Sequence, residues 1–409
     1  MPDFWSWRER MYRVALRITP AQLRAVAATT TRSICSRAAT RYCEFHYLQH
    51  REDGSAYDDP LALCWVLADA AADSGIGLTL LPVLYERAGF PRRPRLREDQ
   101  RRFRVRAGCG TPPRASTQRS GRSSVRGSRC IRCARPRRRR SMRCARSPKA
   151  STARSASTSP SGRRKSTTVS PPPARPIEWL AREGHLDARW QLVHATHTTR
   201  AEIDAVARSG AAVVICPSTE GNLGDGLADL PGWLEAGVPI AIGSDGHVGR
   251  DWPRRATRST TASASRCASA ASPRHRARRR PSTAARRFDE AMRAGGAAAG
   301  QKRWGLVVGA RADALMADAR DPALAGVPPE RWLGTQIFSA PARPWRDVMV
   351  AGRWVIRDGV HPQGEAIAAR FAERCVRCGT KKAEARGELI SSLAAQGEGQ
   401  ERGGSRWMA

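Results

Sequence analysis

The sequence predicts an α/β protein built on part of a (β/α)8 barrel of the TIM type, with a remnant small β-sandwich domain and disordered basic insertions. The main observation is the alternation of short apolar runs with helix-like segments between residues 190 and 245. Near-continuous apolar runs of this length are typical of parallel strands that are buried on both faces of a sheet. Two Arg-rich segments without acidic residues predict the insertions.

Each of the three apolar runs in this region ends at a chemically capable side chain. The first run ends at His194, the second at Cys216 and the third at Asp245. Between the first two, Thr199 begins a capping-box pattern, and Gly210 marks the end of the predicted helix. A (β/α)8 barrel places its active site at the C-terminal ends of its strands. We therefore expect His194 and Asp245 to converge on one mouth of the partial barrel.

The N-terminal part of the sequence contains the same kinds of element. Helices and strands are predicted, in chain order, over 4–24, 43–48, 59–74 and 76–85. Residues 27–41 lose the apolar spacing of the first helix. Asp59 followed by Pro60 is a helix-start signal, and Gly75 is the matching stop signal.

The rest of the chain contains further helices and short strands. Helices are predicted over 176–184 and 288–300. The runs 305–313 and 347–359 alternate apolar and polar residues between glycine turns, which suits the small β-sandwich. The polar tail from about residue 376 is expected to be disordered.

Two segments differ in composition from everything else in the chain. Residues 101–175 contain 21 Arg, two Lys and no acidic residue, and residues 252–287 contain 11 Arg and no acidic residue. Together they account for the whole formal net charge of +34. Because they offer little apolar surface to offset the loss of chain entropy, we expect both segments to be disordered.

We interpret these basic segments as coding sequence read in a shifted frame. GC-rich DNA read out of phase yields mainly Arg, Ala, Ser, Pro, Cys and Gly, which is the composition of both segments. Residues 27–41 have a similar composition, and we interpret them as a shorter segment read in a shifted frame. We predict two barrel parts, 1–100 and 176–249, separated by the basic segment 101–175. A second basic segment, 250–287, follows. Residues 288–375 contain the last barrel helix and the small domain, and 376–409 form the tail.

The sequence predicts no membrane segment. No run approaches 18 apolar residues, and the N-terminus has no apolar core of a secretory signal. Six of the 11 cysteines lie in the basic segments or in 27–41, and the other five suit a reducing compartment. We therefore expect a cytoplasmic protein without a membrane partner.

Several motifs are longer and more specific than single elements. They are CEFHYLQH, GIGLTLLPVLYERAGF, WQLVHATH, CPSTEGNLGDG, AIGSDGHV, GLVVGARADAL and VMVAGRWVIRDG. With FWSWRERMYRVALRITP near the N-terminus, they resemble the formimidoylglutamate deiminases of the amidohydrolase superfamily. The resemblance covers well over half of the chain.

The resemblance implies a zinc-dependent hydrolase of histidine catabolism that converts N-formimino-L-glutamate to N-formyl-L-glutamate and ammonia. It also implies a mononuclear zinc held by an H-x-H pair after the first strand, a histidine after the fifth and an aspartate after the eighth. Such a metal lowers the pKa of its bound water, so that hydroxide can attack the formimino carbon at neutral pH. A glutamate three residues after the fifth-strand histidine then moves the protons.

Four residues match positions to which the resemblance assigns a role. Asp245 matches the zinc-binding aspartate, which also accepts a proton from the water. His194 matches the histidine that stabilises charge on the attacked centre. Arg8 and Tyr85 match positions that bind the substrate. His197 is interpreted instead as a hydrogen-bonded scaffold residue.

The other residues of the implied zinc site have no match in this sequence. The H-x-H pair would precede Phe4, where only three residues stand, and the H-x-x-E would lie within 101–175, where there is no His and no Glu. Asp245 is then the only family ligand retained, and one carboxylate cannot fill a tetrahedral zinc site. We therefore expect the chain as written to be inactive.

Three other functional classes remain open. One is a non-catalytic nucleic-acid-binding protein, because a run such as 135–140 would neutralise phosphates. Since Phe103 is the only aromatic residue in 101–175, we expect such binding to be nonspecific. The others are a pseudoenzyme that keeps a partial barrel, and another deaminase of the amidohydrolase superfamily. The resemblance itself implies a small-molecule substrate and a homodimer.

Overall fold

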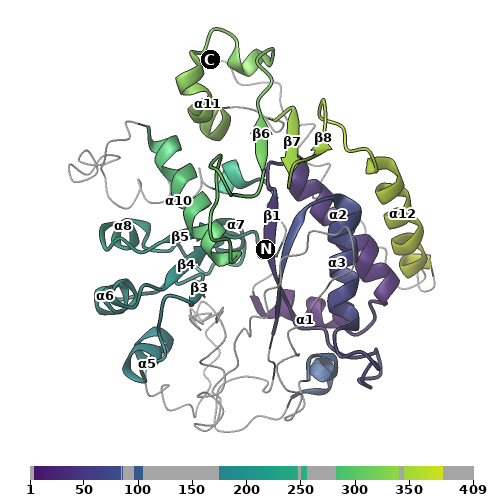
Figure 1. Ribbon diagram of the computed structural model, residues 1–409. Helices are drawn as coiled ribbons and strands as arrows, with labels where there is room; N and C mark the ends of the chain where they lie inside the picture. The colour runs from purple at the N-terminus through teal and green to yellow at the C-terminus, as the bar shows by residue number, and fades with distance from the viewer. Residues whose placement is uncertain are drawn as a thin grey trace, which may run out of the picture.

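Over the residues that it describes, the computed structural model contains three β-sheets flanked by helices (Figure 1). It describes residues 4–83, 85, 96–104, 175–246, 250–255, 282–339 and 345–380, with side chains for all of these except 4–5 and 376–380. The strands of the first two sheets run parallel, and those of the third run antiparallel. The chain is therefore an α/β protein in which the parallel sheets carry the βα units.

The first described residues form two helices, α1 (Phe4–Ala15) and α2 (Pro20–Ser36), where the sequence predicts one helix over 4–24. Thr19 is the N-cap of α2, and its side chain accepts a backbone N–H of the first helical turn. Pro20 takes the first helical position. Because proline has no backbone N–H with which to continue the preceding helix, the prediction of a single helix is wrong at this point.

The second half of α2 covers residues 27–36, which the sequence places outside the periodic structure. Ala28 and Ile34 are buried, and this helix contacts the next one along the chain. Thr31 donates its hydroxyl hydrogen to the carbonyl of Ala27 at 2.8 Å. The prediction for 27–36 is wrong, because small residues bury this face and threonine satisfies its hydroxyl within the helix.

The first parallel sheet pairs β1 (Arg41–His46) with β2 (Gly77–Pro82), and α3 (Ala62–Ser74) connects them. Asp59 accepts a backbone N–H two residues further on at 2.8 Å, just before the helix begins. Gly75 ends the helix in the left-handed conformation, with a φ of 70°. The two predicted strands and the helix between them are confirmed, the first strand two residues earlier and the other two elements with shorter bounds. The N-cap of the helix is Leu61, so the prediction of Asp59 at that position is wrong.

The second parallel sheet has the strand order β3 (Gln191–Val193), β4 (Ala212–Ile215), β5 (Ile240–Ile242). The helices around it are α5 (Pro176–Arg182), α6 (Arg200–Ser209), α7 (Pro217–Asn222), α8 (Leu230–Glu235) and α10 (Thr283–Ala298). Helix α6 has the capping box at Thr199 and the left-handed Gly210 that the sequence predicts. The parallel β-α-β-α-β arrangement is confirmed.

The core of this unit lies between the sheet and its outer helices. Leu192, Val213 and Ile215 of the strands belong to one apolar cluster with Ile203 of α6 and Trp233 of α8, and each is at most 3% exposed. In Figure 1, α5, α6 and α8 lie along one side of the sheet and α10 lies beside β5. Burial of this apolar surface fixes the strand ends to which the polar residues are attached.

The third sheet consists of β6 (Ala314–Met316), β7 (Asp347–Val350) and β8 (Arg353–Ile356). Val348 belongs to one buried cluster with Ile34 of α2, so this sheet joins its core to that of the first parallel unit. Within the described ranges the C-terminal part forms one antiparallel sheet, where the sequence predicts a small β-sandwich.

The run 305–313 forms turns rather than the predicted strand, and β6 begins only at Ala314. Leu306 is 85% exposed and Val308 is 94% exposed, so the alternating pattern has no apolar surface to pack against. The prediction of a strand over 305–313 is wrong, because alternation specifies a strand only where one face is buried.

The remaining described elements are η1 (Glu98–Phe103), η3 (Pro322–Leu324), η4 (Pro329–Arg331), α11 (Trp332–Phe338) and α12 (Gly364–Thr380). Helix α12 contacts α2 and continues past residue 376, so the start of the predicted disordered tail is helical. Residues 381–409 lie outside the described residues. Among the helices that the structure describes, none is both long and apolar enough to cross a membrane.

The edges of both basic segments belong to the folded structure. Arg102, Arg255 and Ala284 are all buried, although the composition assigns each of them to an insertion. Residues 105–174 and 256–281 lie outside the described residues, so their disorder and their shifted reading frame stay predictions.

Candidate active site

His194 is held at the C-terminal end of β3 by an unusual turn. Its backbone N–H continues the parallel ladder and donates to the carbonyl of Val214 at 2.8 Å. The next turn of the chain is sharp, because His194 and Ala195 have φ values of 72° and 48°. Positive φ is uncommon for residues other than glycine and is found where the surrounding structure fixes the backbone. Tertiary contacts therefore set the position of the His194 side chain.

Asp245 follows β5, the edge strand opposite β3, and meets His194 beyond the ends of the strands. The Oδ2 atom of Asp245 lies 3.9 Å from Nε2 of His194, and the two side chains are 7% and 8% exposed. Asp245 also has a positive φ, of 45°. The predicted convergence of these two side chains at the ends of parallel strands is confirmed.

The close approach of β4 and β5 depends on Gly243. Its N–H donates to the carbonyl of Ile215 at 2.8 Å. A Cβ atom at this position would lie 2.6 Å from Sγ of Cys216, which is closer than any ordinary contact. Glycine is therefore required between the sheet and the turn that carries Asp245.

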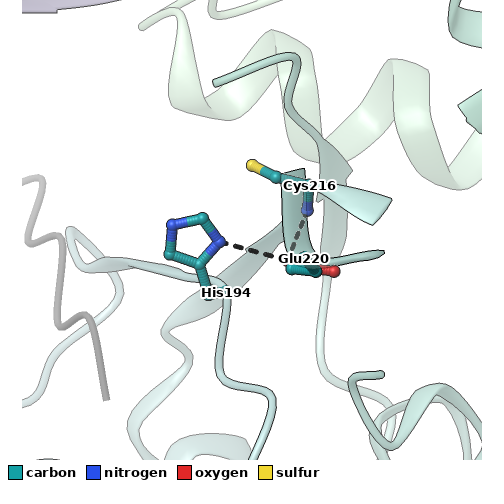
Figure 2. A group of neighbouring side chains, drawn as sticks. All are labelled: His194, Cys216 and Glu220. Carbon is teal, nitrogen blue, oxygen red and sulfur yellow. Dashed lines mark hydrogen bonds and ion pairs between the residues drawn. The ribbon is translucent and has the colours of Figure 1, made fainter. Parts of the chain in front are cut away.

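Glu220 of α7 is the main partner of His194, and sequence reasoning missed it. The Oε1 atom of Glu220 lies 3.2 Å from Nδ1 of His194 and accepts the backbone N–H of Cys216 at 2.6 Å (Figure 2). Glu220 is 1% exposed. A buried carboxylate needs such hydrogen bonds to offset the loss of hydration. The signal was its place in CPSTEGNLGDG, four residues after the strand end at Cys216.

The residue before Glu220 contacts the loop that carries Asp245. The hydroxyl of Thr219 donates to the carbonyl of Ser244 at 3.5 Å and accepts the N–H of Gly246 at 3.4 Å. Helix α7 therefore links both predicted catalytic residues, through Glu220 on one side and Thr219 on the other.

Glu44 adds a carboxyl group from the first parallel sheet. Burial, with a further contribution from the negative charge of Asp245, raises the pKa of Glu44 from 4.5 to about 7. This electrostatic coupling joins β1 to the end of β5 across the two sheets. Sequence reasoning placed Glu44 on a strand and gave it no role.

Arg8 and Tyr85 belong to a second group of side chains. The guanidinium of Arg8 lies 5.8 Å from the ring centre of Tyr12, whose hydroxyl is 3.2 Å from that of Tyr85. Gln100 donates to both hydroxyls, at 2.9 Å and 3.1 Å. Burial and the neighbouring Tyr12 raise the pKa of Tyr85, so its phenol stays neutral. The four predicted site residues therefore lie in two groups, His194 with Asp245 and Arg8 with Tyr85.

His197 has the scaffold role that the sequence suggests. Its Nε2 atom lies 2.8 Å from the backbone carbonyl oxygen of Asp225. The hydrogen bond holds the loop after α7 against the turn that precedes α6.

Comparison with known proteins identifies the family of this chain. The model of the amidohydrolase family matches residues 173–355, which include His194, Glu220 and Asp245. A formimidoylglutamate deiminase of Pseudomonas aeruginosa is 36% identical over 387 residues, which cover 91% of this chain and 82% of the relative. This chain belongs to the amidohydrolase family.

Solved structures of amidohydrolases share the fold. An amidohydrolase from Brucella melitensis is 30% identical and superimposes with a TM-score of 0.76, covering 91% of this chain and 82% of the other. An adenosine deaminase from Xanthomonas campestris, solved with bound zinc, has a TM-score of 0.68 at 17% identity, covering 93% and 81%. The amidohydrolase fold of this chain is therefore clear.

The donor atoms at the site fit zinc only in part. Asp245 Oδ2 is buried, and in the described part of the chain it has no hydrogen-bond partner, as expected of a carboxylate oxygen meant for a metal. Over the same residues, the one group of three donors is His194, Cys216 and Glu220, whose ligand atoms lie within 4.8 Å of one another. This group does not contain Asp245, so the described residues do not form the four-ligand site of the family.

Proposed function

We propose that this site is built for the hydrolytic deimination of N-formimino-L-glutamate to N-formyl-L-glutamate and ammonia. The observation that carries the proposal is the buried pair His194–Asp245 at the ends of two parallel strands, 3.9 Å apart. The 36% identity to a formimidoylglutamate deiminase supports this choice of substrate within the amidohydrolase family.

We further propose that the two parallel sheets are parts of one (β/α)8 barrel, and that the antiparallel sheet is the remnant of a β-sandwich. The effect of the Asp245 charge on the pKa of Glu44 supports the first point, because it requires a carboxylate of β1 to lie near the end of β5. The mouth of such a barrel is where amidohydrolase chemistry would occur.

Asp245 would accept a proton in the reaction, and His194 would stabilise charge. A zinc ion, when bound, would supply a water of lowered pKa at neutral pH. Asp245 Oδ2 lacks a hydrogen-bond partner in the described residues and can accept a proton from such a water. His194 Nε2 faces the same space and, once it has accepted a proton there, can stabilise the charge that develops on the attacked centre.

Arg8 and Tyr85 suit the substrate, which carries two carboxylates. Arg8 offers a guanidinium that can bind a carboxylate in bidentate fashion. Tyr85 offers a neutral hydroxyl held by Gln100, because burial raises the pKa of this phenol. Both residues lie on the part of the chain that precedes the first basic segment.

We propose in addition that the 409-residue chain does not turn over this substrate. Residues 101–175, where the resemblance places the H-x-x-E, contain no His and no Glu. Asp245 alone cannot hold zinc tightly, since structural and catalytic zinc sites use three or four protein ligands. We expect less than about a tenth of an equivalent of zinc per chain after purification.

The test is a paired measurement on the purified full chain. Zinc content is measured by atomic absorption, and ammonia release from N-formimino-L-glutamate is followed with a coupled assay. We expect neither zinc nor ammonia above background. Turnover by this chain that Asp245→Asn abolishes would overturn the proposed inactivity and would show that other residues complete the site.

A further inference from the structure

The buried carboxylate of Glu220 has no role in the proposed chemistry, yet it contacts His194 directly. We propose that Glu220 is the positioning residue of His194: it fixes the imidazole as the Nδ1–H tautomer and turns the bare Nε2 toward Asp245. The proposal deepens the proposed function, on which its catalytic meaning rests. The tautomer itself is a property of the folded chain and can be measured without substrate or metal.

The first support is the hydrogen bonding of Glu220 Oε1. This single oxygen accepts the backbone N–H of Cys216 at 2.6 Å and faces His194 Nδ1 at 3.2 Å. An ionised carboxylate can only accept hydrogen bonds, so the ring nitrogen that faces it must carry the proton. A neutral imidazole then has its lone pair on Nε2, the atom that lies 3.9 Å from Asp245 Oδ2.

The second support is the rigidity of the contact. Glu220 is 1% exposed and His194 is 6% exposed, so water cannot replace either partner easily. The turn at His194 and Ala195 adopts positive φ values that the isolated chain would disfavour. A hydrogen bond from the side chain of His194 to α7 compensates for this strain and selects one ring orientation.

The same three residues could instead bind a metal ion, because their donor atoms lie within 4.8 Å of one another. Two observations favour the hydrogen-bonded arrangement. Figure 2 shows the backbone nitrogen of Cys216 directed at Glu220 and its sulfur atom turned away from that carboxylate. That sulfur lies against Gly243, 2.6 Å from where a Cβ would stand, so the backbone just after β5 limits its movement toward a shared ion.

The experiment measures histidine tautomers in the full 409-residue chain by long-range 15N–1H NMR after histidine labelling, at a pH where imidazoles are neutral. His194→Gln identifies the signals of His194. His197 and His361 are internal references, because each places Nε2 beside a backbone carbonyl, at 2.8 Å and 3.0 Å, and must protonate that nitrogen. We expect the opposite pattern for His194, with the proton on Nδ1.

Two substitutions of Glu220 separate positioning from a general structural role. Glu220→Gln keeps an oxygen that can accept from Cys216 and His194, so we expect the Nδ1–H tautomer to remain. Glu220→Met keeps the volume and removes the acceptor, so we expect His194 to lose its single tautomer while His197 and His361 keep theirs. An unchanged His194 in Glu220→Met, with the references intact, would overturn the proposal.

Two further outcomes decide the matter even if Glu220→Met does not fold. A parent chain in which His194 carries its proton on Nε2 overturns the proposal directly. Addition of Co2+ tests the metal alternative: a thiolate-to-cobalt band that Cys216→Ser removes, together with a shift of His194 Nδ1, would also overturn it. We expect no such band. Since no turnover is measured, failure of the proposed function would leave these results unchanged.

Discussion

His194 Nε2 and Asp245 Oδ2 lie 3.9 Å apart at the ends of strands β3 and β5, with β4 between these strands. Both residues lie just beyond the last residue of their strands. The turns at His194 and Asp245, both with positive φ, bring the two side chains together although β4 separates their strands. Helix α7, which follows β4, fills the space beside them through Thr219 and Glu220.

Gly243 should not tolerate even a methyl group without a loss of stability. A Cβ there would lie 2.6 Å from Cys216 Sγ and 3.2 Å from Val214 Cγ1. We expect Gly243→Ala to destabilise the chain by about 1–3 kcal/mol through overpacking. Gly221→Ala is the matched control, since nothing lies within 4 Å of its Cβ. Denaturant unfolding checks both, and equal midpoints for the two variants would contradict this packing.

Arg102 should be essential for stability although the composition assigns it to an insertion. Its guanidinium donates to the carbonyls of His50, Ala15 and Ile18 at 2.9, 2.6 and 2.9 Å. Removing a buried cation leaves these acceptors unpaired, so we expect Arg102→Met to cost about 3 kcal/mol. Arg104→Met changes an exposed arginine and should have little effect. A thermal shift as small for Arg102→Met as for this control would contradict the burial.

Glu44 should give the zinc-free chain a specific pH dependence. Burial, with a contribution from Asp245, raises its pKa from 4.5 to about 7, so between these values the folded chain keeps a proton that the unfolded chain has released. Stability from this group therefore falls as pH rises through the interval. Relative to the parent, Glu44→Gln should gain on the order of 2 kcal/mol between about pH 4 and about pH 8. A pH-independent difference between the two chains would contradict this shift.

Local signals in the sequence were sufficient where the structure is local. The capping box at Thr199 and the left-handed Gly210 define α6 as predicted. The alternation of apolar and polar residues over 305–313 predicted a strand that does not form. Val308 is exposed, and the pattern alone does not show whether a surface is present to bury it. Pro20 was overlooked as the start of a second helix, although its Thr19 N-cap is a legible local signal.

The missed residues depend on contacts between distant parts of the chain. His194 and Asp245 were identified because family motifs single them out, and the structure brings them together. Glu220 was missed since its role depends on a histidine from another strand, and spacing within CPSTEGNLGDG cannot show that contact. Glu44 required the juxtaposition of two sheets. Both roles depend on buried contacts between different strands and helices, and the sequence pattern does not show which elements pack together.

The central claim is that this chain keeps a deiminase site that lacks ligands, and a chimera tests it most directly. Residues 105–174 are replaced by the aligned segment of the Pseudomonas aeruginosa relative, and the N-terminal segment of that relative is added in front. We predict about one zinc per chain and ammonia release from N-formimino-L-glutamate, which Asp245→Asn lowers by at least about 100-fold. A folded chimera that binds zinc but releases no ammonia, or one that is insensitive to Asp245→Asn, would contradict the account.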